Sequence, residues 1–242
     1  MKDVVRTALA TILVSGLAAA PAHAATIMKY SVDLTPINGI GSASAFLQLD
    51  NTAKTLQVDI TASGLDAGMH LAHLHGRFSG GVAGTPINSV LPDPTDDMDG
   101  DGFVELAEAL PDYGAIILNM NTIGTGSTIN FSQLFDLTDP MNYGFVGGDP
   151  ANPAYDIADL IGSGGMSLDL RELIVHGQNA SAVGAGTPGE VDGTAGFKAL
   201  LPTLGGEIGA VPEPATWLMM LLGFGAVGAI TRSRRRVSLR YA

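Results

Sequence analysis

Short segments in which apolar and polar residues alternate constrain the fold of this chain most strongly. MKYSVDL (28–34) has an apolar residue at every second position, which places these side chains on one face of an extended strand. The pattern returns in SASAFLQLDN and TLQVDITASGL, and the short break at 51–54 between them predicts a β-hairpin. Such alternation is typical of strands buried on one face.

Further strand-like segments are separated by breaks rich in glycine, aspartate and proline. They are MHLAHLH (69–75), GAIILNM (114–120), STINFSQLFDL (127–137), LRELIVHG (170–177) and GFKALLPT (196–203). The 32 glycines and the low aromatic content of 6 % suit short strands joined by many turns. We therefore predict an all-β, antiparallel sandwich or barrel, with a long loop over 141–167 that holds at most a brief helix near 157–161.

The N-terminus has the features of a secretory signal. Lys2 and Arg6 precede an apolar stretch of small residues, and Ala22-His23-Ala24 fits the cleavage rule of signal peptidase. We expect residues 1–24 to be a signal peptide that is removed, so that the mature chain starts at Ala25.

The C-terminus reads VPEPATWLMMLLGFGAVGAITRSRRR, in which the apolar run 217–230 leads directly into an arginine cluster. This order resembles the PEP-CTERM sorting signal of Gram-negative bacteria. The resemblance makes Pro212-Glu213-Pro214 the recognition site of an exosortase, a membrane transpeptidase, within a sorting region over 206–242. It implies a short transmembrane helix at 217–230, a transient anchor in the inner membrane, and release to the outer surface or the extracellular matrix. A plain C-terminal anchor is the alternative.

The body of the chain is strongly acidic and has no cysteine. Residues 25–210 contain 22 Asp and Glu but only five Lys and Arg. This charge disfavours nucleic acid as a partner and favours divalent cations. The absence of cysteine excludes disulfides and thiolate metal sites.

Three of the five histidines stand in MHLAHLHG. On a strand, His73 and His75 share one face and His70 points to the other. Two imidazoles at this spacing can bind one metal ion, but a site needs at least one more protein ligand. The last histidine of the mature chain is His176, in LRELIVHG, and imidazole ligands suit copper, zinc, iron or nickel. Alternatively, His73 and His75 are surface residues, while His70 is a core residue bonded to the backbone.

Three segments resemble the Cu/Zn superoxide dismutases. GLDAGMHLAHLHG is similar to the strand that supplies two copper ligands, LRELIVHGQNA to a strand that supplies another, and DGTAGFKAL to the segment with the substrate-guiding arginine. The resemblance implies a Greek-key sandwich or barrel with copper ligands at His73, His75 and His176. It makes His70 a structural histidine that supports the ligands, and it gives Lys198 the anion-guiding position.

Departures from the dismutases bear on activity. No histidine lies between His75 and His176, so the zinc subsite and the fourth copper ligand are missing. AHLHG followed later by Val-His looks like the CHRD domain, which would cover 25–205. This match implies the fold more than the activity. Together with the export signals, it leads us to predict a non-catalytic, exported protein of the cell surface or the extracellular polysaccharide matrix. The alternative is a copper-binding protein or a dismutase-like oxidoreductase that uses the three histidines.

DMDGDGFVELAE (97–108) matches an EF-hand calcium loop at every position that needs a particular residue. The ligand positions hold Asp97, Asp99, Asp101, the Phe103 carbonyl, Glu105 and Glu108. Pro92 and Pro94 exclude an entering helix, and we expect a short exit helix over 104–110 that stops before Pro111. The loop is therefore expected to be an insertion on a β scaffold, where calcium replaces disulfides as a stabiliser. A solvated turn without an ion is the alternative.

Overall fold

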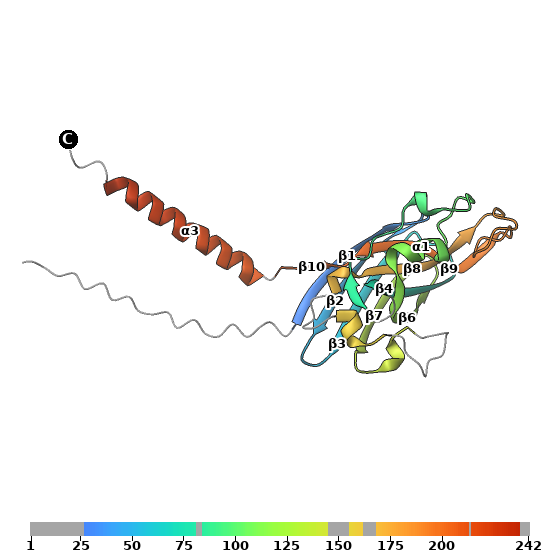
Figure 1. Cartoon of the computed structure of the whole chain (residues 1–242), viewed down its shortest axis with the longest axis horizontal. Helices are drawn as coiled ribbons and strands as arrows, with labels where there is room; N and C mark the ends of the chain where they lie inside the picture. The colour runs from blue at the N-terminus through green and yellow to red at the C-terminus, as the bar shows by residue number, and fades with distance from the viewer. Residues whose placement is uncertain (1–26, 81–83, 145–154, 162–167, 213, 238–242) are drawn as a thin grey trace, which may run out of the picture.

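The computed structural model describes residues 27–80, 84–144, 155–161, 168–212 and 214–237. These residues form a mainly antiparallel β-structure with few helices, and a separate helix follows it at the C-terminus (Figure 1). The signal peptide expected over 1–24 lies outside the described residues, as does most of the loop expected over 141–167.

The strands are β1 Ile27–Pro36, β2 Ser42–Asp50, β3 Thr55–Ser63, β4 Met69–Ser79, β5 Thr85–Ile87, β6 Ala115–Thr125, β7 Thr128–Asp136, β8 Glu172–Ala180, β9 Gly196–Glu207 and β10 Gly209–Ala210. The α-helices are α1 Leu106–Tyr113, α2 Ile157–Ile161 and α3 Pro214–Val237. Short 3₁₀ helices lie at Pro94–Asp96, Pro140–Asn142 and Leu168–Leu170. All segments with predicted strand character overlap these strands, and the brief helix expected near 157–161 is confirmed as α2.

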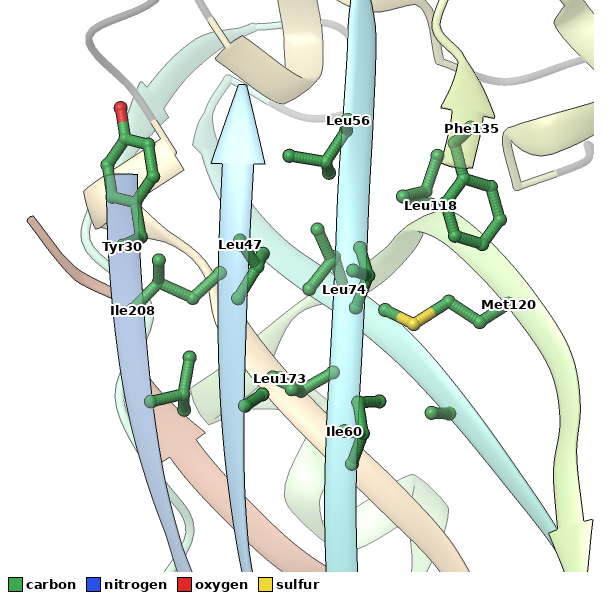
Figure 2. Close-up of a cluster of buried hydrophobic side chains, with 14 of the residues drawn as sticks. Tyr30, Leu47, Leu56, Ile60, Leu74, Leu118, Met120, Phe135, Leu173 and Ile208 are labelled. Atoms are coloured by element: carbon green, nitrogen blue, oxygen red, sulfur yellow. The ribbon is translucent and has the colours of Figure 1, made fainter. Parts of the chain in front are cut away.

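The strands follow the order β5-β4-β8-β9-β1-β2-β3-β7, with β6 paired to β4 and β10 paired to β1. All the pairings are antiparallel. Because β1 pairs with both β2 and β9, the sheet continues from one layer into the other. Figure 2 shows Leu47 and Ile60 from one layer meeting Leu74 and Leu173 from the other, and all four are fully buried. Burial of this shared apolar face is the main favourable term for the fold.

The hairpin predicted at 51–54 is confirmed between β2 and β3. Asp50 faces Thr55 and Leu47 faces Val58, so the apolar faces of the two strands coincide. The Asp50 carboxylate accepts hydrogen bonds from the backbone N–H groups of Thr52 and Ala53 at 2.9 Å, which closes the turn.

Helix α1 differs from the expected exit helix, which was to end before Pro111. The helix instead runs through Pro111 to Tyr113. Only two helical residues follow the proline, and the N–H of Gly114 closes the last turn on the Leu110 carbonyl at 3.0 Å. Because Tyr113 is fully buried, its packing outweighs the local cost of the proline. As expected, no α-helix enters the acidic loop among the described residues 84–96, which hold the short strand β5 and a 3₁₀ turn.

The β-structure continues beyond residue 205. Strand β9 ends at Glu207, and β10 pairs Ala210 with Tyr30 before the chain leaves the sheet. Helix α3 then lies apart from the strands, and its described side chains over 218–232 are exposed (Figure 1). Among the helices of the described chain, none has the length and apolarity needed to cross a membrane. The apolar run 217–230, in which a short transmembrane helix was expected, is shorter than the roughly 20 residues of a typical spanning helix.

Candidate metal centres

The histidine cluster lies on the outer face of strands β4 and β8. Leu71 faces His176 and His73 faces Ile174 across the antiparallel pair, and residues in such register share a face. The intervening Ala72 and Leu74 are buried in the apolar core on the opposite side. The period-two alternation therefore sends the core residues inward and brings His73, His75 and His176 together outside the sandwich.

The three imidazoles converge closely. Their ring centroids are 5.6 Å apart for His73 and His75, 4.9 Å for His73 and His176, and 5.9 Å for His75 and His176. One ring nitrogen of each histidine lies within 4.8 Å of the corresponding nitrogens of the other two. Two nitrogens bound to one zinc ion at about 2.0 Å are at most about 4.0 Å apart, so a spacing within 4.8 Å is close to that of a three-histidine metal site and leaves at most a small inward shift on binding.

Hydrogen bonds fix which nitrogens are free to bind a metal. His75 donates from Nδ1 to the Gly114 carbonyl at 2.9 Å, and His176 donates from Nδ1 to the Leu200 carbonyl at 2.7 Å. In a neutral imidazole this leaves Nε2 as a lone-pair donor. The Nε2 atoms of His75 and His176 and the Nδ1 atom of His73 are buried without a hydrogen-bond partner. Metal-binding histidines commonly donate their second N–H to a backbone carbonyl in this way.

The surroundings keep all three imidazoles neutral. Burial, followed by the neighbouring His176 and His75, lowers the pKa of His73 to about 2. Burial and then His176 lower the pKa of His75 to about 3, and burial lowers the pKa of His176 to about 4. Neutral imidazole is the form that binds transition metals, so the cluster keeps its lone pairs at neutral pH.

Helix α1 and the acidic loop before it cover the cluster. His73, His75 and His176 are only 6 %, 1 % and 0 % exposed although they lie outside the sandwich core. The ring of Tyr113, at the end of α1, lies 4.2 Å from the ring of His75. Tyr113 also packs with Val104 and Ile174 in a small apolar cluster. The alternative that these histidines are surface residues does not apply to this structure.

His70 and Lys198 lie outside the cluster. Nδ1 of the buried His70 is 3.2 Å from the His176 carbonyl oxygen, and its Nε2 is 2.9 Å from the Asp66 carbonyl oxygen. His70 thus connects the backbone around the cluster without offering a ligand. Lys198 forms an ion pair with Asp192 at 2.7 Å, so its ammonium group is held at this carboxylate.

The acidic loop is ordered by hydrogen bonds from its own backbone. Asp97 accepts from Gly100 and Gly102, at 2.8 and 2.9 Å. Glu108 accepts from Met98 at 2.8 Å through one oxygen and from Glu105 at 2.9 Å through the other. Glycine suits residues 100 and 102, where φ is +78° and +94°. These contacts gather the carboxylates at the start of α1.

Two overlapping carboxylate triads result: Asp97, Asp99 and Glu108, and Asp99, Asp101 and Glu105. One oxygen each of Asp99, Asp101 and Glu105 is buried without a hydrogen-bond partner, and Glu105 is only 1 % exposed. Burial and then the neighbouring carboxylates raise the pKa values of Asp101 and Glu105, although a backbone hydrogen bond opposes each rise. A hard cation such as calcium binds carboxylate oxygens of this kind, because it gives them a partner and offsets the repulsion between their charges.

Residues without a sequence motif support the acidic loop. Asn38 bonds to the Val104 backbone through both its amide nitrogen and its amide oxygen, at 2.9 and 2.8 Å. Glu190 accepts from the N–H of Leu106 at 3.0 Å, and Glu105 accepts from the N–H of Val191. The segment around Glu190 therefore closes over the acidic loop. Long-range partners of this kind leave no local signal in the sequence.

Comparison with known proteins identifies a motif at the C-terminal end of the chain. Residues 210–236 match the PEP-CTERM protein-sorting motif. No curated protein matches the chain. The motif begins where β10 ends, and it includes Pro212, Glu213 and Pro214, which were expected from the sequence. As the signal for exosortase processing, this motif marks the chain as an exported bacterial protein that is sorted to the cell surface.

Proposed function

We propose that this chain is a non-catalytic, metal-binding β-sandwich of CHRD type, exported to the outer surface or extracellular matrix of a Gram-negative bacterium. In this proposal His73, His75 and His176 hold one transition-metal ion, of which copper is an example. The observation that carries it is the convergence, within 4.8 Å, of nitrogens from three buried imidazoles, of which each has a buried nitrogen without a hydrogen-bond partner. Buried polar atoms are rarely left unsatisfied without a functional reason.

A calcium ion in the acidic loop is the second part of the proposal. It is supported by the buried, unpartnered oxygens of Asp99, Asp101 and Glu105, beside the further carboxylates of Asp97 and Glu108. The Phe103 carbonyl, which the loop pattern assigns as a ligand, would complete the oxygen shell. Such a site stabilises the folded state because the ion binds it and not the unfolded chain.

A dismutase-like copper enzyme is the second candidate, and the three-histidine cluster favours it. Two observations weigh towards the non-catalytic function. The chain has no histidine for the zinc subsite, and Lys198 is paired with Asp192. Superoxide turnover by the copper-loaded chain, measured against the His176→Ala variant, would decide for the enzyme.

An extracellular polysaccharide is the proposed partner. The outer face of β2, β3 and β7 bears rows of small polar side chains, in which Ser42 faces Ser63 and Ser63 faces Thr128. This face contains a shallow groove of about 510 Å³ at the end of the three strands. Hydroxyl side chains such as Ser44 and Thr61 suit a neutral, hydroxyl-rich polymer. Co-sedimentation with matrix polysaccharide, lost in Thr61→Arg, would support this partner.

Metal analysis of the exported chain, purified without chelator and without a histidine tag, tests the central proposal. We expect about one calcium and about one transition-metal ion per chain. The transition metal should be absent from His176→Ala, and the calcium should be absent from Glu108→Gln. A wild-type chain that takes up no transition metal, even after incubation with copper and zinc, would refute the histidine site.

A further inference from the structure

Helix α1 connects the two candidate metal centres directly. Its first turn belongs to the acidic loop, since Glu105 precedes the helix and Glu108 lies within it. Its last residue, Tyr113, contacts His75, and Gly114 follows immediately. With eight residues, the helix is about 12 Å long. A helix of about two turns therefore separates the carboxylates from the imidazoles.

The N-terminal end of α1 is held by the carboxylates of the loop. Glu108 and Glu105 cap the first turn reciprocally, and Glu108 also accepts hydrogen bonds from Met98 and Asp99 at 2.8 and 3.3 Å. Glu105 remains with one buried oxygen that has no partner. Without a cation, mutual repulsion among these groups opposes the arrangement that positions the helix. An ion in the loop therefore favours the observed position of α1.

The C-terminal end of α1 orients His75. The carbonyl of Gly114 accepts the Nδ1–H of His75 at 2.9 Å, which directs Nε2 toward His73 and His176. Gly114 has a φ of +82°, and a Cβ atom there would overlap the carbonyl of Gly76. Tyr113 is fully buried against the His75 ring. A shift of the helix end would therefore move a ligand and expose it to water.

We propose that α1 couples the two centres, so that calcium in the acidic loop tightens transition-metal binding at the three histidines. Tyr113 and Gly114 are the positioning residues that transmit this effect to His75. The inference rests on the proposed function of both centres. Because binding free energies are linked, a metal at the histidines must tighten calcium binding by the same factor.

Zinc titration of the full exported chain tests the coupling. Zinc has no redox chemistry, and its dissociation constant can be measured by competition with a chromophoric chelator, in calcium and in equimolar magnesium. Coupling free energies are typically about 1–3 kcal/mol, so we expect zinc to bind about 5- to 150-fold more tightly in calcium. His176→Ala is the control for zinc bound at the acidic loop instead.

Two variants of Tyr113 separate positioning from general stability. In Tyr113→Leu the zinc affinity should no longer depend on calcium, while calcium stoichiometry is unchanged. Tyr113→Phe keeps the ring against His75 and should restore the dependence. If Tyr113→Leu does not fold, Glu108→Gln provides the second test, because its zinc affinity should stay at the calcium-free value in both buffers.

The possible outcomes distinguish the coupling from the sites themselves. Equal zinc affinities in calcium and magnesium, with both ions bound, would overturn the coupling and leave the two sites intact. A chain that binds no calcium, or no zinc, would overturn the proposed function together with the coupling. Calcium-dependent affinity that persists in Tyr113→Leu would overturn the assigned route through α1.

Discussion

Nδ1 of His70 lies 3.2 Å from the carbonyl oxygen of His176, so one histidine of the MHLAHLHG strand supports the backbone of a candidate ligand on another strand. The two residues are 106 positions apart in the chain. Nε2 of His70 also lies 3.1 Å from the Gly126 carbonyl oxygen. His70 therefore ties together the chain segments around β4, β6 and β8 without itself facing the metal position.

We expect His70→Ala to lower both stability and metal affinity without changing the metal stoichiometry. Loss of the ring leaves buried carbonyl groups without partners, which should cost about 1–3 kcal/mol of unfolding free energy. Displacement of the His176 backbone should weaken zinc binding about tenfold. Urea unfolding and zinc titration measure the two effects. Lys198→Gln is the control, because loss of its exposed ion pair with Asp192 should change neither the stability appreciably nor the zinc affinity.

The metal-free protein should lose stability as the pH falls below about 6.5. The pKa values of His75 and His176 are lowered to about 3 and about 4 in the folded state, chiefly by burial. Between these values and the ordinary value of about 6.5, the unfolded chain binds more protons than the folded chain, so acid favours unfolding. The free energy of unfolding should change by at most about 1.4 kcal/mol per pH unit for each histidine.

Urea unfolding at pH 6.5, 6.0 and 5.0 measures this dependence before most carboxylates titrate. The variant His176→Gln removes one titrating group and should show a smaller loss over the same range. An unchanged slope in this variant would mean that His176 does not stay neutral in the folded protein.

Glu172 should make the protein less stable as the pH rises, whereas the histidines make it less stable as the pH falls. It is 1 % exposed and stands opposite both His75 and Glu207 in the sheet. Burial, and then the charge of Glu207, raise its pKa to about 8. Between about pH 4.5 and 8 the folded chain therefore holds a proton that the unfolded chain releases, so stability falls as the pH rises through this range.

Glu172→Gln should remove this loss, since glutamine does not ionise. The variant should gain stability relative to the wild type from pH 5 to pH 9, by up to about 1.4 kcal/mol for each unit of the pKa difference. Denaturant midpoints of the metal-free proteins at both pH values provide the comparison. Glu207→Gln should give a partial gain, because it removes only the neighbouring charge. A constant difference across the pH range would contradict the assignment.

The sorting signal can be tested independently of the metal centres. Replacing Pro212-Glu213-Pro214 by three alanines should prevent exosortase processing, because the matched motif contains this tripeptide. Mass spectrometry of the chain from an exosortase-carrying bacterium should then find the C-terminal segment retained. Pro36→Ala, at an exposed position outside the motif, should be processed normally. Normal processing of the tripeptide variant would contradict its role as the recognition site.

Local patterns in the sequence determined the strands and the sorting signal of this protein. Alternation in 28–34 and in the segments after it predicted the strands correctly, because a sheet buried on one face requires an apolar residue at every second position. The C-terminal motif could also be recognised in the sequence, because a processing signal is a continuous segment of the chain. The predicted end of α1 before Pro111 was wrong. Pro111 is visible in the local sequence, whereas the packing of Tyr113, which outweighs the effect of the proline, depends on distant parts of the chain.

Only the tertiary structure decided how the histidine site is built, whereas the carboxylates of the acidic loop lie within one local pattern. The spacing of His73 and His75 left open whether they are ligands or surface residues, and their burial depends on α1 folding over the outer face of β4 and β8. Their meeting with His176 depends on the pairing of two strands that lie far apart in the chain. Such contacts arise from the packing of distant segments, and no local pattern encodes them.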